Sequence, residues 1–274
     1  MNKEEYLISN FKSNKIGDDG AVIGKFVYSK DMFCEDIHFK LTWMSLKQIA
    51  IKSMLVNISD AIAMNAKPQQ ALIGLVIPST FSFQQIKELS SGFKEMANKY
   101  CLDIIGGDTS SGKKLIISIT IISQTKKPIY RNNMKKGDLI AYTGSLGEVK
   151  KGLTRLLRGG TLNSKHKFIT PVLKAGFFYE SAKYINAGLD ISDGLSKDLS
   201  RLCKSSGNLG VNFLKKLSKY ELCSGEEYEI LFSFIPKNLI KIKSLAKKHR
   251  TTITIFAKAK QGHYESTCKE NHFN

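Results

Sequence analysis

Aspartates are the residues in this sequence whose spacing most clearly suggests chemistry. The chain has 11 aspartates, and seven of them lie in short polar motifs. Carboxylate oxygens are the ligands that Mg²⁺ prefers, and the chain has few histidines to favour zinc or copper instead. Several Mg²⁺ ions beside glycine-rich turns are typical of enzymes that transfer phosphoryl groups from nucleotides. The seven residues are Asp18, Asp19, Asp31, Asp60, Asp108, Asp190 and Asp193.

Asp60 lies inside a predicted helix over 45–65, between Ile58 and Ile62. Aspartate is unfavourable in a helix interior, and an unpaired buried carboxylate is costly. A metal ion or a basic partner would offset that cost. An exposed side chain, or a cap between two shorter helices, is the alternative. Asp18 and Asp19 follow Gly17, and this motif is equally compatible with a simple turn.

The segment Gly106-Gly107-Asp108 precedes a predicted strand. Two glycines allow a backbone to approach a phosphate closely, and an aspartate beside them can hold Mg²⁺. A tight turn is the alternative interpretation. The motif matches neither the Walker A loop nor the dinucleotide-binding fingerprint.

Asp190 and Asp193 flank the end of a predicted strand that leads into a helix over 195–205. Ligands commonly bind where such strands end, although Asp193 or Ser192 can also act as the N-cap of the helix. A third acidic group, Glu226-Glu227-Tyr228-Glu229, opens a hydrophobic strand; a solvated turn is its alternative.

The elements that must position these residues alternate between strands and helices in both halves of the chain. We therefore predict an α+β fold with two mixed lobes, joined by the basic segment 126–137. Further predicted strands cover 21–29, 71–77, 115–122, 138–143, 188–191, 227–234 and 252–258. Further predicted helices cover 82–100, which Ser82 and Gln85 begin as a capping box, and 146–157, 172–186 and 237–249.

Composition sets the limits of the functional prediction. The 274 residues include 42 Lys+Arg and 24 Asp+Glu, a net charge of +18, which keeps a nucleic-acid-binding protein open as an alternative. No apolar run is long enough to cross a membrane, and the N-terminus lacks a signal peptide's apolar core, so we expect a cytoplasmic protein. Five scattered cysteines without a Cys-x-x-Cys pair indicate neither a disulfide framework nor a zinc site.

The motifs, taken in order, resemble those of the thiamine-monophosphate kinases. This family belongs to an ATP-binding superfamily that also includes aminoimidazole ribonucleotide synthetase and selenophosphate synthetase. The Gly-Glu-Glu-Tyr-Glu segment separates the kinases from these relatives. The matching segments are 16–19, 29–31, 38–39, 56–60, 63–68, 105–109, 131, 137–138, 143–147, 190–195 and 225–232.

The resemblance implies that ATP phosphorylates thiamine monophosphate to thiamine diphosphate. It implies an N-terminal ATP- and Mg²⁺-binding lobe, residues 1–133, whose sheet pairs with a second copy in a homodimer. A C-terminal α+β lobe, residues 134–274, would complete a site between the lobes. We expect ATP and thiamine monophosphate as the partners, and neither nucleic acid nor a membrane.

The resemblance also assigns roles by position. The catalytic residues would be Asp108, Arg131 and Asp193. ATP would contact Gly107, Asp108, Arg131 and Ser192, whereas thiamine monophosphate would contact His38 and Glu226. Several Mg²⁺ ions would be held by Asp19, Ser29, Lys30, Asp31, Asp60, Asp108, Asp190 and Asp193.

Two residues depart from the family pattern. Lys30 replaces the usual threonine, and Glu270 replaces an aromatic residue that helps to bind thiamine. The segment between Phe213 and Glu221 is also short. These departures keep an inactive paralogue open as an alternative, together with another ATP-dependent enzyme of the superfamily.

Overall fold

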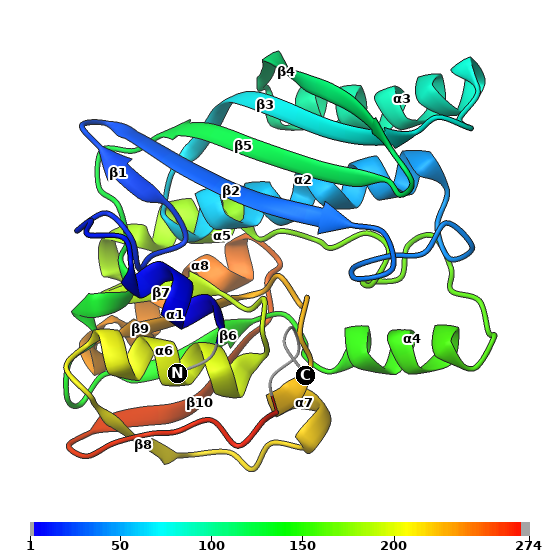
Figure 1. Cartoon of the computed structure of the whole chain (residues 1–274). Coiled ribbons are helices and arrows are strands. Elements are labelled where there is room, and N and C mark those ends of the chain that lie inside the picture. The colour runs from blue at the N-terminus through cyan, green and yellow to red at the C-terminus, as the bar shows by residue number, and fades with distance from the viewer. Residues whose placement is uncertain (1–2, 270–274) are drawn as a thin grey trace.

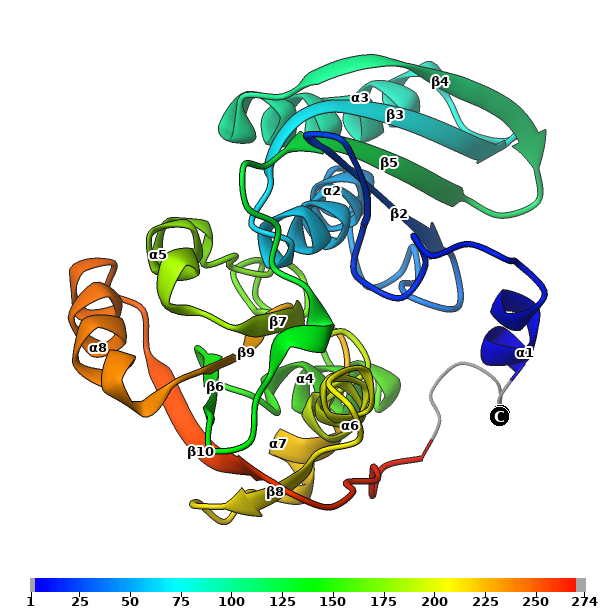
Figure 2. The same cartoon turned by 90° about the vertical axis from the view of Figure 1, so that its left-hand side faces the viewer.

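A computed structural model describes residues 3–269 and contains two five-stranded sheets, one in each half of the chain (Figure 1). Helices pack against both sheets, and the two lobes meet along one long helix, α2 (Figure 2). The predicted α+β fold with two mixed lobes is therefore confirmed. The lobe boundary between residues 133 and 134 stays a prediction. It lies within the connection between the two sheets, after β5 (Ile116–Gln124) and before β6 (Leu139–Thr143). No helix in the described part of the chain is long and apolar enough to span a membrane.

The N-terminal sheet has the order β1-β2-β5-β3-β4. β3 and β4 run parallel, whereas the other neighbours are antiparallel. The strands are β1 (Ala21–Ile23), β2 (Phe26–Cys34), β3 (Lys67–Pro78), β4 (Asp103–Gly112) and β5 (Ile116–Gln124). A short helix, α1 (Lys3–Ser9), precedes them.

Two helices of 18 residues, α2 (Leu46–Ala63) and α3 (Phe83–Tyr100), cover one face of this sheet. Both begin with the capping box that satisfies the first backbone N–H groups of a helix; Ser82 and Gln85 form it in α3, as predicted. α3 buries one side only, whereas most residues of α2 are buried because it also packs on the second lobe. α2 is therefore the element that both lobes share.

The C-terminal sheet has the order β7-β9-β6-β10-β8. Phenylalanines of β9 pack towards α5 and α8 on one face, while Leu231 joins the core beneath α6 on the other. Its strands are β6 (Leu139–Thr143), β7 (Ala187–Asp190), β8 (Gly210–Phe213), β9 (Ile230–Phe234) and β10 (Ile253–Lys260). Its helices are α4 (Glu148–Leu157), α5 (Ala175–Ser181), α6 (Leu195–Ser205), α7 (Lys219–Cys223) and α8 (Leu239–Lys248).

The segment that contains Asp108 is a strand, which neither the phosphate-binding interpretation nor the alternative of a tight turn predicted. β4 runs through Gly106-Gly107-Asp108 and pairs with β3 across an irregular register. Gly107 has a φ of +151°, and a Cβ there would overlap the carbonyl oxygen of Ile73. Gly107 thus serves a close approach between two strands. α1, β8 and α7 were also not predicted, because each is short and weakly patterned.

One cysteine pair corrects the expectation of no disulfide. Cys223 at the end of α7 is bonded to Cys268, 45 residues later in the chain. The sequence could not indicate this pair, because only the fold brings the two residues together. The departure at Glu270 lies outside the described residues.

Candidate active site

A cleft of about 720 Å³ lies between the two lobes and collects most of the predicted site residues. Its walls come from the loop before β1, from β2 and α2 of the first lobe, and from the loops after β7 and before β9 of the second. The predicted residues that line it are Asp19, Lys30, Asp31, His38, Asp60, Arg131, Asp190, Ser192, Asp193 and Glu226.

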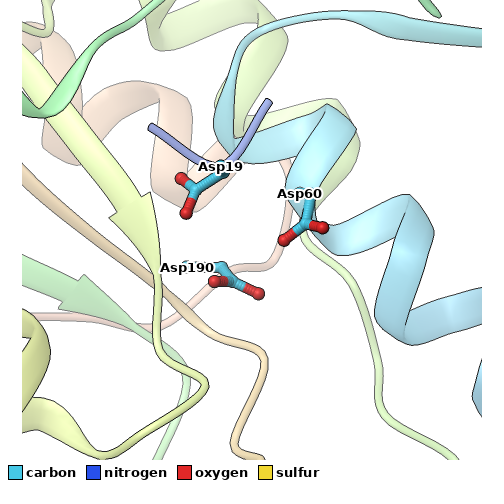
Figure 3. A group of neighbouring side chains, drawn as sticks. All are labelled: Asp19, Asp60 and Asp190. Atoms are coloured by element: carbon cyan, nitrogen blue, oxygen red, sulfur yellow. The ribbon is translucent and has the colours of Figure 1, made fainter. Parts of the chain in front are cut away.

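Asp19, Asp60 and Asp190 form the centre of the cleft. One carboxylate oxygen from each lies within 4.8 Å of the other two. Figure 3 shows the three carboxylates converging from the N-terminal loop, from α2 and from the end of β7. One side-chain oxygen of Asp19, Oδ2, is buried without a hydrogen-bond partner among the described residues. A divalent cation coordinated by oxygen ligands fits this donor set.

Neighbouring residues near the end of α2 hold the cluster together. The side-chain oxygen of Asn57 accepts a hydrogen bond from the backbone N–H of Asp31 at 2.8 Å, which ties β2 to the helix. The hydroxyl of Ser59 donates to Oδ2 of Asp190 at 2.7 Å. Asn57, Ser59 and Asp60 therefore each connect α2 to a different part of the cleft.

Two carboxylates of the cluster have raised pKa values, so they bind protons more readily than exposed aspartates do when no cation is present. Burial raises the pKa of Asp60 well above its usual value, and the charges of Asp31, Asp190 and Asp19 raise it further. Burial also raises the pKa of Asp190, against the lowering effect of the hydrogen bond from Ser59. Carboxylates forced together in this way favour either protons or cations.

Two arginines lie beside the carboxylates. Arg131 forms an ion pair with Asp19, and its guanidinium also donates to the carbonyl oxygen of Gly17 at 3.3 Å. Arg201 of α6 forms ion pairs with Asp193 and Asp198. The cleft therefore offers positive charge close to its acidic centre.

Asp198 is buried beneath the loop after β7. Its Oδ2 accepts hydrogen bonds of 3.1 Å from the backbone N–H groups of Asp193 and Gly194, so the carboxylate shapes this loop. Burial raises its pKa to about 7, although the charge of Arg201 opposes the rise.

The predicted substrate residues His38 and Glu226 line the cleft together with Tyr228. His38 Nδ1 accepts a hydrogen bond from the backbone N–H of Cys34 at 2.9 Å, which leaves the proton of a neutral ring on Nε2. Oε2 of Glu226 lies 2.6 Å from the ammonium of Lys52, on α2.

Four of the residues that we predicted to bind Mg²⁺ or ATP are not placed to bind these ligands directly in the cleft of the same chain. Asp108 is exposed on β4, and Gly107 is paired with Ile73. The hydroxyl of Ser29 is buried and directed to the backbone of α2, 3.4 Å from Asn57 O. The ammonium of Lys30 contacts Ser118 on β5, so it is directed away from a role as a metal ligand, although the residue lines the cleft.

The separation of Asp108 from the cluster follows from the sheet order. Asp31 pairs with Ile119, Ile119 with Ile73, and Ile73 with Gly107. Three steps between neighbouring strands amount to about 14 Å. Asp108 therefore does not join the Asp19–Asp60–Asp190 cluster within one chain.

Sequence reasoning did not identify Lys52, Ser59, Arg201 and Asp198 as parts of the site. A usable signal existed for Lys52, which is a single charge within the apolar run 49–56 and lies two helical turns before Asp60. Asp198 and Arg201 have ordinary spacing for a solvated helix face, so only the structure reveals them.

The chain is similar to known proteins in both sequence and fold. Residues 17–125 match the family described as AIR synthase related protein, N-terminal domain. The chain is 34% identical over 261 residues to a thiamine-monophosphate kinase of Buchnera aphidicola subsp. Schizaphis graminum, covering 85% of this chain and 80% of the relative. It is 30% identical to that of Nitrosopumilus maritimus over 77% of this chain and 74% of the relative.

Among solved structures, one described as AaThiL complexed with AMPPCP and TMP superposes with a TM-score of 0.84 at 24% identity. The match covers 96% of this chain and 91% of that one. This similarity establishes the shared fold across both lobes.

Proposed function

The chain belongs to the thiamine-monophosphate kinase family, and we infer from this that its cleft phosphorylates thiamine monophosphate with ATP to give thiamine diphosphate and ADP. The enzyme is a thiamine-phosphate kinase. The observation in this molecule that carries the inference is the carboxylate cluster of Asp19, Asp60 and Asp190 between the lobes. The solved structure with the similar fold is a complex with AMPPCP and TMP, and both ligands are compatible with an acidic cleft that gathers cations.

We propose that Asp19, Asp60 and Asp190 hold Mg²⁺, with Asp31 and Asp193 extending the site to further ions. The unpartnered Oδ2 of Asp19 and the crowding of buried carboxylates support a cation here. When bound, Mg²⁺ would neutralise phosphate charge and align the group that is transferred.

The phosphate group of thiamine monophosphate is the acceptor of the transferred phosphoryl group, and its chemistry determines which catalytic groups the protein needs. A phosphate monoester has a second pKa of about 6, so its oxygen is largely ionised at neutral pH and needs no general base. Repulsion between two anions is the main obstacle, and Arg131 and Arg201 supply positive charge at the cleft. We propose direct in-line transfer: the acceptor oxygen bonds to the γ-phosphorus as the bond to the ADP oxygen breaks.

The thiamine part of the substrate would lie towards His38, Glu226 and Tyr228. The thiazolium ring is cationic and the aminopyrimidine carries N–H donors, so the carboxylate of Glu226 suits both. Ser192 adjoins this end, because its carbonyl oxygen accepts a hydrogen bond from the backbone N–H of Glu226 at 2.7 Å, and it follows Asp190 of the carboxylate cluster by two residues.

We propose that a second copy of the chain supplies Asp108 and Gly107 to the site. Nine of the ten residues of β4 are exposed, and Met32, Leu72, Ile104 and Ile105 leave apolar surface open on the same sheet. An edge strand of this length needs a cover, and a homodimer through this sheet would provide one.

Incubation of the purified protein with ATP, Mg²⁺ and thiamine monophosphate tests the function, with chromatography to detect thiamine diphosphate. We expect product with wild-type enzyme and none with Asp60→Asn, whereas the control Glu180→Gln, on α5 and outside the cleft, remains active. Absence of product at every Mg²⁺ concentration would overturn the kinase assignment. Salt-dependent binding of random DNA without ATP turnover would instead favour the nucleic-acid alternative.

A further inference from the structure

Lys52 is a charged residue inside the protein, on α2. Its side chain has 0% exposure, and its Nζ lies 2.6 Å from Oε2 of Glu226. A buried ammonium is unfavourable unless it is paired and held by further contacts. The ion pair joins α2 of the first lobe to the segment before β9 of the second.

Two aromatic rings complete the surroundings of the Lys52 ammonium. Its Nζ lies 4.1 Å from the ring centroid of Phe168 and 5.5 Å from that of Phe33. Both distances are within the range of cation–π attraction, which strengthens when water is excluded. The ammonium is therefore held from three sides, by β2, by the segment before α5 and by Glu226.

Glu226 is fixed at its backbone as well as at its side chain. It has a positive φ of 56°, and its N–H donates to the carbonyl oxygen of Ser192. Its side chain keeps 24% exposure and lines the cleft. Oε2 is engaged by Lys52, whereas Oε1 has no hydrogen bond or ion pair within residues 3–269. Because Lys52 occupies Oε2, Oε1 is the carboxylate oxygen of Glu226 that is available to accept a hydrogen bond from a ligand.

Lys52 is also connected to His38, the other residue predicted to bind the substrate, through the ring of Phe33. Phe33, whose ring lies against the ammonium, is stacked on the His38 ring with centroids 5.4 Å apart. Lys52 therefore contacts one neighbour of His38 and pairs directly with Glu226. No other described lysine has a fully buried side chain in contact with this end of the cleft.

We propose that Lys52 is a positioning residue for the thiamine end of the site: it holds the Glu226 carboxylate so that Oε1 accepts a hydrogen bond from the ring system of the substrate. The proposal rests on the function inferred above. Lys52 itself does not touch substrate, because it is buried behind Glu226. A purely structural lysine would affect folding alone, whereas a positioning lysine selectively affects recognition of thiamine monophosphate.

Lys52→Met tests this proposal, because methionine keeps the length of the side chain and removes the charge. We expect KM for thiamine monophosphate to rise by about ten- to a hundredfold, the range for losing a hydrogen bond to a charged group. KM for ATP should change by less than about twofold, since the metal cluster lies at the other end of the cleft. The matched control is Lys47→Met, on the same helix, which removes only an exposed pair with Glu95.

A double-mutant cycle shows whether Lys52 acts through Glu226. In a Glu226→Gln background, adding Lys52→Met should change KM for thiamine monophosphate by less than about twofold, because the oriented carboxylate is already gone. Equal effects of Lys52→Met in both backgrounds would overturn the proposal, as would an unchanged KM in the single variant. If Lys52→Met does not fold, Lys52→Gln retains a donor without charge and is measured in the same cycle.

The outcomes separate this proposal from the proposed function. If the wild-type enzyme forms no thiamine diphosphate, the proposed function itself is wrong. An active enzyme in which Glu226→Gln leaves KM unchanged removes the role of Glu226. If the wild-type enzyme is active and Glu226→Gln raises KM for thiamine monophosphate but Lys52→Met does not, only the positioning role of Lys52 is wrong.

Discussion

The hydroxyl of Ser59 donates a hydrogen bond to Oδ2 of Asp190 and so connects α2 of one lobe to the end of β7 of the other. The bond is buried, and it lies beside the point where the three clustered carboxylates meet. The carboxylate cluster is therefore assembled only when the two lobes are docked. Cation binding and lobe docking should depend on each other.

Ser59→Ala tests this dependence. Loss of the bond should lower the free energy of unfolding by about 1–3 kcal/mol, because the buried Asp190 loses a partner. The pKa of Asp190 should rise further, since the hydrogen bond lowers it in the wild type. The apparent Mg²⁺ affinity, measured by calorimetry, should therefore fall more at pH 6.5 than at pH 8.5. Ser90→Ala on α3 is the control, because Ser90 bonds only to its own helix; equal losses at both pH values would contradict the prediction.

Asp60→Asn should affect stability in opposite directions with and without cation. In EDTA at pH 8 the variant should melt at a higher temperature than the wild type, because a crowded buried charge is removed. Each kcal/mol corresponds to roughly 2–4 °C in a protein of this size. Added Mg²⁺ should raise the Tm of the wild type and leave the variant nearly unchanged. A variant that still shows the wild-type shift with Mg²⁺ would remove Asp60 from the metal site.

Asp198 predicts the pH dependence of the metal-free protein. Its pKa is raised from 3.8 to about 7 by burial, so between these values the folded state holds a proton that the unfolded state has lost. The stabilisation is complete below pH 3.8 and is lost as the pH rises through 7, with a slope of up to about 1.4 kcal/mol per pH unit. Urea unfolding in EDTA between pH 5 and pH 8 measures the slope. Asp198→Asn should flatten it, and an unchanged slope would show that other groups cause it.

The position of Asp108 predicts complementation between inactive variants. Asp60→Asn and Asp108→Asn should each be inactive alone if a partner chain supplies Asp108. A mixed dimer then contains one doubly altered site and one intact site, so an equal mixture should regain about a quarter of wild-type activity. Activity is measured after the two proteins are unfolded and refolded together. An Asp108→Asn enzyme that stays inactive in the mixture would contradict the shared site.

Sequence alone could identify α2, α3 and most strands of both sheets, because their apolar patterns are clear, but it missed β4 and β8. It could also identify Asp19, Asp31, Asp60, Asp190 and Asp193 as neighbours through their motifs. It could not place Asp108, because a strand and a turn are equally compatible with Gly106-Gly107, and only the contact with Ile73 distinguishes them. The Lys52–Glu226 pair was not accessible either, since it joins residues 174 positions apart across the lobes.

The spacing of Lys52 and Asp60 along α2 has a consequence for the size of the substrate. Lys52 and Asp60 are separated by eight residues, so a rigid helix keeps the two ends of the cleft about 12 Å apart. A molecule that engages both Glu226 and the carboxylate cluster must extend over a comparable length. We therefore expect a short phosphate ester that lacks the second ring to engage one of these two groups only, so that the spacing along the helix discriminates between substrates by length.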